Sequence, residues 1–174
     1  MTRLLLAALL LGITACSSHP ASADKADASA AATQIRLPLV IRNAKGNHRF
    51  DVEVARSPQE QERGLMFRTS IETDGGMLFP MSPPRTASFW MENTLVPLDM
   101  LFIRTDGSIA FIKANAEPYS RIPVSAGIPV AAVLELRGGR AAELGIAPED
   151  RVRWGRCAAP AEKVADGLDF CPAP

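Results

Sequence analysis

Apolar residues recur with a period of two in the region between residues 34 and 156, and this pattern limits the fold more than any other feature of the chain. In residues 35–42 (IRLPLVIR) every second residue is Ile or Leu, and in residues 50–54 (FDVEV) Phe and Val alternate with acids. The turn-forming stretch 43–47 (NAKGN) separates them. Because successive side chains of a strand point to opposite faces, these segments predict a β-hairpin with one polar face.

Further short strands and turns follow at intervals of about ten residues. We expect strands at residues 77–79, 87–91, 98–103, 108–113, 130–136 and 151–154. Ser57, Pro58 and Glu60 form the pattern that begins a helix, here ending near residues 64–68, and residues 139–144 suit one or two helical turns. The prediction is therefore a mainly β fold: a single small sandwich or barrel-like domain over residues 34–156, with one or two short helices.

The first 33 residues have the composition of an export signal followed by a tether. Arg3 precedes the apolar stretch 4–13, so residues 1–15 read as a signal peptide. Residues 13–16 (ITAC) resemble a bacterial lipobox, which predicts lipidation of Cys16; the alternative is an ordinary signal peptide cleaved elsewhere. Residues 16–33 are rich in alanine and serine and suit a flexible tether. By similarity to lipoprotein sorting signals, Ser17 favours the periplasmic face of the outer membrane, with the lipid holding the protein to the membrane.

Two cysteines remain after Cys16. In an oxidising periplasm, Cys157 and Cys171 most simply form a disulfide that closes the tail of residues 157–174. A redox-active or metal-binding pair is the alternative, but the spacing is not that of a CxxC motif and no histidines accompany it.

Charge and motifs exclude several classes of function. The chain has 174 residues and a formal net charge of +0, which gives no electrostatic basis for nucleic-acid binding. No glycine-rich phosphate loop, serine nucleophile elbow or HExxH motif is present, and His48 is the only histidine outside the tether. Five methionines offer thioethers for Cu(I), but most lie in apolar segments where packing explains them. We therefore expect no metal and no cofactor.

Four motifs follow one another in the middle of the chain. They are residues 62–68 (ERGLMFR), 76–79 (GMLF), 89–99 (FWMENTLVPLD) and 133–136 (VLEL), the last followed by Gly139 and by residues 144–146 (LGI). In this order they resemble the domain of unknown function 192 family over roughly residues 36–155. The resemblance implies a compact, often exported β domain and no particular reaction. Pro80 and the pair Pro83-Pro84 depart from the motif and stiffen the loop expected after residue 79.

Asp99 is the first candidate for a functional side chain. In a strand over residues 98–103 it shares a face with Leu101 and Ile103, where an unpaired carboxylate costs several kcal/mol. It therefore needs a partner. It either stabilises the preceding turn through hydrogen bonds or faces a ligand, in a cleft built from a set of polar and aromatic residues: Arg63, Arg68, Trp90, Asn93, Thr94 and Asp99.

Three functions remain open. The leading hypothesis is a non-enzymatic binding module for a polar small molecule or an envelope saccharide, in which Trp90 stacks on the ligand; otherwise Trp90 fills the core. The second is a hydrolase that uses Asp99 and Glu135 as its two carboxyls; otherwise Glu135 lies on a solvated strand face. The third is a scaffold lipoprotein without a small-molecule site.

Overall fold

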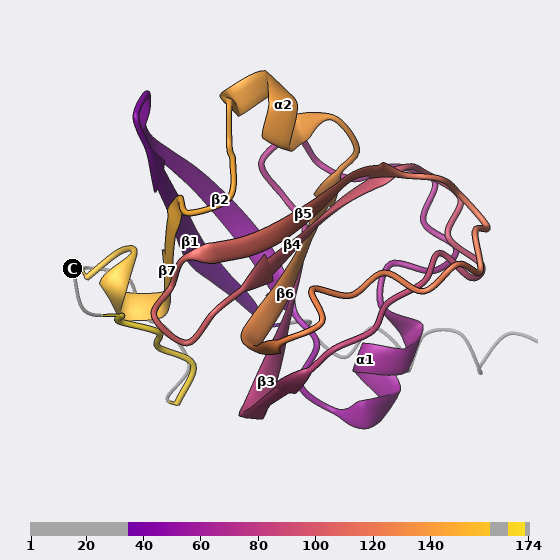
Figure 1. Cartoon of the computed structure of the whole chain (residues 1–174), viewed down its shortest axis with the longest axis horizontal. Helices are drawn as coiled ribbons and strands as arrows, with labels where there is room; N and C mark the ends of the chain where they lie inside the picture. Colours follow the sequence, from indigo (N-terminus) through magenta and orange to yellow (C-terminus); the bar gives the residue numbers. More distant parts are fainter. Residues whose placement is uncertain (1–34, 161–166, 173–174) are drawn as a thin grey trace, which may run out of the picture. The chain divides into compact units, whose positions relative to one another are not determined.

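A seven-stranded sheet forms the framework of the part of the chain that the computed structural model describes, residues 35–160 and 167–172 (Figure 1). Its strands are β1 (Arg36–Asn43), β2 (Gly46–Val54), β3 (Met77–Thr86), β4 (Leu98–Ile103), β5 (Ile109–Ala116), β6 (Pro129–Arg137) and β7 (Arg151–Trp154). The short helices are α1 (Pro58–Arg63) and α2 (Arg140–Leu144), with a 3-10 turn at Gly155–Cys157.

The spatial order of the strands is β5-β4-β6-β3-β2-β1-β7. Neighbouring strands are antiparallel except β2 and β3, which pair in parallel through Glu53 with Met77 and Val54 with Leu78. The two ends of the sheet approach each other at the start of β5, where Ser108 forms a bridge with Arg151 and Ile109 N donates to the carbonyl of Asp150 at 2.9 Å. The mainly β prediction with two short helices is confirmed, and the sheet is not closed into a barrel.

Both faces of the sheet are covered by apolar side chains. All six residues of β4 are buried, and they alternate between two clusters. Leu101 and Ile103 belong to the first core, which continues into β1, β2 and β7. Met100 and Phe102 belong to the second core, which is covered by residues from the segments around 65–71, 87–96 and 124–126. The polypeptide between the strands thus builds a second layer on one face of the sheet.

The segment 87–91 belongs to this covering layer, so the prediction of a strand there is wrong. It makes a single bridge, between Phe89 and Val124. Instead β3 is longer than predicted, because it continues to Thr86 through a bulge between Pro80 and Arg85. The proline-rich segment after residue 79 is therefore extended strand rather than a separate loop.

The expected start of α1 is confirmed in detail. Ser57 Oγ accepts a hydrogen bond from the backbone nitrogen of Glu60 at 3.1 Å, and Glu60 Oε2 accepts one from the backbone nitrogen of Ser57 at 2.8 Å. This reciprocal capping box satisfies two donors that the first turn of a helix leaves open. It fixes where α1 begins, and hence where Glu62 and Arg63 lie.

The carboxyl-terminal residues return to β7. The predicted disulfide is present between Cys157 and Cys171, whose Cα atoms are 5.5 Å apart. Beside it the rings of Trp154 and Phe170 stack with centroids 4.1 Å apart. The predicted signal peptide, Cys16 and the tether lie outside the described residues. Within residues 35–160 and 167–172, no helix has the length and apolar character needed to cross a membrane.

Candidate functional site

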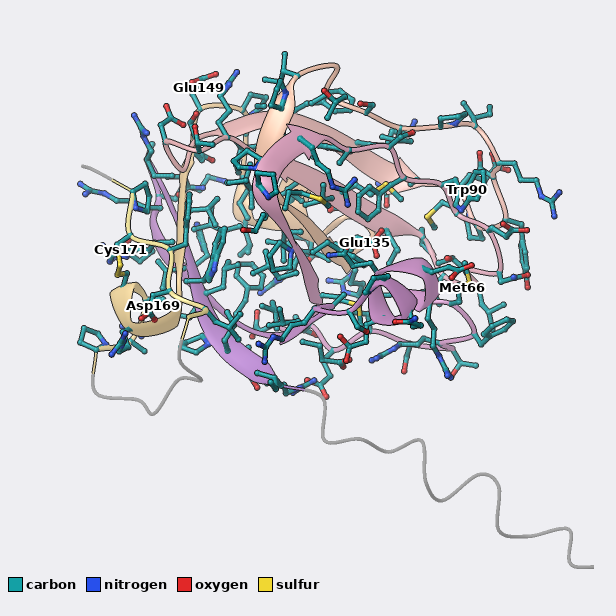
Figure 2. All side chains as sticks on the ribbon, turned by 90° about the horizontal axis from the view of Figure 1, so that it is seen from below. Met66, Trp90, Glu135, Glu149, Asp169 and Cys171 are labelled. Atoms are coloured by element: carbon teal, nitrogen blue, oxygen red, sulfur yellow. A yellow bond between two sulfur atoms is a disulfide. The ribbon has the colours of Figure 1, made fainter. Side chains whose placement is uncertain are left out.

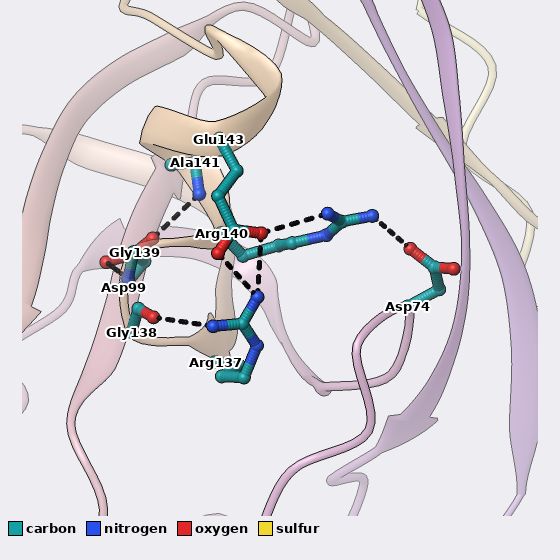
Figure 3. Close-up of polar contacts among 8 residues, drawn as sticks. All are labelled: Asp74, Asp99, Arg137, Gly138, Gly139, Arg140, Ala141 and Glu143. Atoms are coloured by element: carbon teal, nitrogen blue, oxygen red, sulfur yellow. Dashed lines mark hydrogen bonds and ion pairs between the residues drawn. The ribbon is translucent and has the colours of Figure 1, made fainter.

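Asp99 is bound by the backbone of its own domain. It is 0% exposed, and its carboxylate accepts hydrogen bonds from the backbone nitrogens of Asn115 at 2.8 Å, Gly139 at 3.0 Å and Ala141 at 2.8 Å. Figure 3 shows it beneath the start of α2, bonded to Gly139 and Ala141. These bonds give the buried side chain its partners and satisfy donors at the beginning of α2. Asp99 is thus bonded within the fold, but to Asn115 and the start of α2 rather than to the preceding turn that the sequence suggested.

Asp99 and Glu135 do not form a carboxyl pair. The two strands are neighbours, with Asp99 opposite Leu136 and Met100 opposite Glu135. Because side chains alternate along a strand, Asp99 lies on the face of the first core and Glu135 on the face of the second. The sheet itself separates the two side chains, so they do not face one common site.

Glu135 is a buried acid to which the described part of the chain supplies no partner. It is 4% exposed, and within the described residues no hydrogen bond or ion pair reaches its carboxyl. Burial raises the pKa of the Glu135 carboxyl to about 8, so the group is mostly protonated at pH 7. The alternative of a solvated strand face does not hold for Glu135. A buried, unpaired carboxyl of this kind is typical of a functional site.

Glu135 lines a pocket of about 350 Å³, a volume within the range of small-molecule sites. Phe79 and Met81 of β3 form an apolar wall together with Leu65, Met66 and Phe89. The remaining lining residues are mostly polar and come from α1, β3 and the segment 88–94: Gln61, Glu62, Arg63, Gly64, Arg85, Ser88, Trp90, Glu92 and Thr94. In Figure 2 Met66 and Trp90 lie at the end of the domain away from Cys171.

Trp90 is placed outward at this pocket. Its side chain is 54% exposed, whereas Met91 is buried and Phe89 packs edge-on against Phe79 with ring centroids 5.0 Å apart. Phe89 and Met91 therefore fill the core, and Trp90 does not. Of the two roles that the sequence left open for Trp90, the exposed aromatic surface is the one the structure supports.

The structure brings together only part of the predicted cleft. Arg63, Trp90 and Thr94 line the pocket with Glu135, and Thr94 is buried with its hydroxyl donating to the carbonyl of Glu92 at 3.2 Å.

Three predicted ligand-binding residues lie elsewhere. Arg68 donates to Glu53 through both terminal nitrogens, with Nη1 2.7 Å from Oε1. Asn93 Nδ2 contacts the sulfur of Met66 at 3.9 Å. Asp99 lies on the opposite face of the sheet, as described above, and none of the three lines the pocket.

The comparisons with known proteins identify the family. The model of DUF192, described as "Uncharacterized ACR", matches residues 40–154. The chain belongs to the DUF192 family. This confirms the resemblance carried by the four sequence motifs. No curated protein matches this DUF192 chain.

Two crystal structures share the fold of this DUF192 domain. One is a protein of unknown function from Novosphingobium aromaticivorans DSM 12444, 44% identical, with a TM-score of 0.68 over 71% of this chain and 89% of that one. The other, from Sinorhizobium meliloti 1021, is called a "putative transcription regulator"; it is 41% identical, with a TM-score of 0.67 over 70% of this chain and 95% of that one. Neither description names a ligand.

The sequence missed several residues of the DUF192 pocket. Arg85 and Ser88 lie in extended or irregular segments whose positions depend on tertiary packing, and no local pattern marks them; Glu92 lies within the motif 89–99 but was not singled out. The burial of Glu135 could have been predicted from the sequence. Glu135 stands between Leu134 and Leu136 in an apolar strand, and the next charged residue is Arg137.

A metal centre in the DUF192 domain would need several ligating side chains close together. Among the residues that the structure describes, no three His, Cys, Asp or Glu side chains gather closely enough to hold a metal ion. The polar groups of the pocket are instead suited to hydrogen bonding and to charge pairing with an organic ligand.

Proposed function

We propose that this DUF192 domain is a binding module that takes a polar small molecule, or the end of an envelope saccharide, in the pocket beside Glu135. The observation that carries the proposal is Glu135, a residue only 4% exposed, whose carboxyl has no partner among the described residues and lines an open pocket. Burying such a group without a hydrogen bond costs free energy. A ligand that bonds to Glu135 would recover that free energy on binding.

The other walls of the pocket support a ligand with both an apolar and a polar side. Phe79, Met81 and Phe89 offer an apolar surface, and Trp90 extends it outward with an indole ring that is more than half exposed. Aromatic rings stack on the apolar face of a sugar, while carboxyl and guanidinium groups bind its hydroxyls or charged substituents. Arg63 supplies such a guanidinium at the end of α1.

Hydrolysis is the second candidate, supported by the raised pKa of Glu135 in the same pocket as Glu62. In this scheme Glu135 donates its proton to the leaving oxygen of a glycosidic bond. Glu62 takes a proton from the water whose oxygen bonds to the anomeric carbon. In this hydrolase hypothesis the second carboxyl beside Glu135 is that of Glu62, in place of Asp99.

The place of action that we propose is the periplasmic face of the outer membrane, with the domain attached through lipid on Cys16. It is supported by the signal-like residues 1–15, the lipobox-like residues 13–16 and the disulfide between Cys157 and Cys171. An envelope saccharide would be within reach of a domain anchored there.

A thermal-shift screen of the purified protein against saccharides and metabolites tests the binding function. We expect hits for the unmodified protein and for Glu149→Gln, a surface variant at the other end of the domain (Figure 2). The same ligands should bind Glu135→Gln and Trp90→Ala at least tenfold more weakly by titration calorimetry. Hits that are unchanged in both pocket variants contradict the proposal. Release of reducing sugar that requires Glu135 and Glu62 favours the hydrolase instead.

A further inference from the structure

We infer that the pocket binds an organic ammonium group, held between the carboxylate of Glu135 and the aromatic side chains of Phe79, Phe89 and Trp90. This inference rests on the proposed binding function and names the chemical class of its ligand. It depends on three features: the missing partner of Glu135, the aromatic walls, and the position of the positive charges.

The first feature is that no described residue is bonded to the Glu135 carboxyl, which lines the pocket. Glu135 and Phe79 are diagonal neighbours on one face of the β3–β6 pair, since Met77 lies opposite Glu135 and Phe79 opposite Val133. The remaining neighbours of Glu135 in register, Met77 and Met100, are apolar. A buried carboxylate requires a positive or hydrogen-bonding partner, and the described residues supply none.

The second feature is the aromatic surface around that place. The rings of Phe79 and Phe89 meet at an interplanar angle of 83°, which forms a corner, and Trp90 stands at the outer side of the pocket. A cation over the face of an aromatic ring is attracted by the ring quadrupole, and several such rings form the sites that recognise quaternary ammonium ligands. A carboxylate beside aromatic walls provides both parts of such a site.

The third feature is the distribution of charge. The other ionisable groups that line the pocket are Glu62 and Arg63 on α1, Arg85 on β3 and Glu92 in the segment that follows β3. Arg63 and Arg85 are both exposed, and neither is bonded to Glu135. Glu92 is paired with Arg121 at 3.1 Å. Among the lining residues, Glu135 and Phe79 are therefore buried, whereas both arginines are exposed.

Binding of a cation should be linked to ionisation of Glu135. The raised pKa leaves the carboxyl mostly neutral at pH 6 and mostly ionised at pH 9. If only the ionised form binds an ammonium ion, the apparent affinity rises in proportion to its population, by about a hundredfold over this range. A ligand without charge gains nothing from the ionisation.

Choline and its neutral carbon isostere 3,3-dimethylbutan-1-ol are matched probes, because choline carries a permanent charge and the two have nearly the same shape. We expect titration calorimetry to give choline binding at least tenfold tighter than the isostere at pH 9. The choline affinity should rise by about a hundredfold from pH 6 to pH 9. In Glu135→Gln, the choline affinity should no longer change between pH 6 and pH 9, and the preference for choline over the isostere at pH 9 should shrink, whereas Glu149→Gln should behave like the unmodified protein.

The possible results separate this inference from the proposed function. Equal affinity for the two probes, or choline binding that is independent of pH, overturns the ammonium inference. If neither probe binds but neutral saccharides bind in a manner that needs Glu135, the inference is again overturned and the proposed function stands. If no compound in either experiment depends on Glu135, both are overturned.

Discussion

The Oδ2 atom of Asp99 lies 2.8 Å from the backbone nitrogen of Ala141, 42 residues further along the chain. Through this bond and the one to Gly139, a strand residue takes the place of a capping side chain at α2, whose own N-cap residue is Gly139. The acid that the sequence marks most clearly is therefore structural.

Replacing Asp99 should destabilise the domain. In Asp99→Asn the side chain can no longer accept all three backbone hydrogen bonds, and its NH₂ group points a donor at another donor. We expect the free energy of unfolding to fall by about 3 kcal/mol, measured by urea denaturation. Glu149→Gln, which alters a surface acid, should change it by less than about 0.5 kcal/mol. Equal effects of the two substitutions would contradict the structural role of Asp99.

Glu135 should make stability depend on pH. The pKa of Glu135 is raised from an ordinary value of 4.5 to about 8 by burial, so the folded state holds a proton that the unfolded state releases. This difference in proton binding stabilises the folded state. The stabilisation is fully present below pH 4.5 and is lost as pH rises through 8, and it amounts to at most about 5 kcal/mol of unfolding free energy.

The comparison of the unmodified protein with Glu135→Gln isolates this effect. Urea denaturation at pH 5 and at pH 8.5 should show a larger loss of unfolding free energy for the unmodified protein. The variant should be the more stable of the two at pH 8.5. Parallel behaviour of the two proteins would show that the carboxyl is not protonated in the folded state.

Trp90 should matter for binding and little for folding. Because the side chain is 54% exposed, Trp90→Ala removes little buried surface, and we expect a loss of unfolding free energy below about 1 kcal/mol. Ligands found in the screen should bind at least tenfold more weakly. Phe79→Ala provides the contrast, since Phe79 is buried and its truncation should cost about 3–5 kcal/mol. A large stability loss in Trp90→Ala would place Trp90 in the core after all.

The disulfide should stabilise the tail against β7. Cys157 and Cys171 are 14 residues apart in the sequence, and closing a loop of this length contributes about 3 kcal/mol in the chain-entropy model. The double replacement Cys157→Ser, Cys171→Ser should lower the melting temperature by about 6–12 °C in a calorimetric scan. A reductant should lower the melting temperature of the unmodified protein similarly and leave the variant unchanged.

Cys16 is expected to carry the lipid. After growth with labelled palmitate, the unmodified protein should be labelled and sediment with the outer membrane, as lipid anchoring requires. Cys16→Ser should be unlabelled and soluble. Label retained in Cys16→Ser would show that the anchor lies elsewhere.

Local patterns predicted those elements that depend on neighbouring residues in the chain. The alternation in residues 35–42 and 50–54 led to β1 and β2, and the capping residues at 57–60 led to α1. Residues 87–91 misled because an apolar run of five residues is equally suited to a strand and to an irregular segment packed over a sheet. Whether residues 87–91 form a strand or an irregular covering segment depends on how they pack against the face of β3, β4 and β6.

By itself, the sequence determined that the chain is mainly β and belongs to the DUF192 family. Side-chain alternation, helix capping and the order of the motifs depend only on residues close together in the chain. It also showed that Asp99 lies on an apolar strand face. Only the tertiary structure decided which acid has hydrogen-bond partners and which has none among the described residues. Asp99 meets three backbone donors from other elements, whereas Glu135, on the neighbouring strand, faces the opposite side of the sheet and meets none within the described residues.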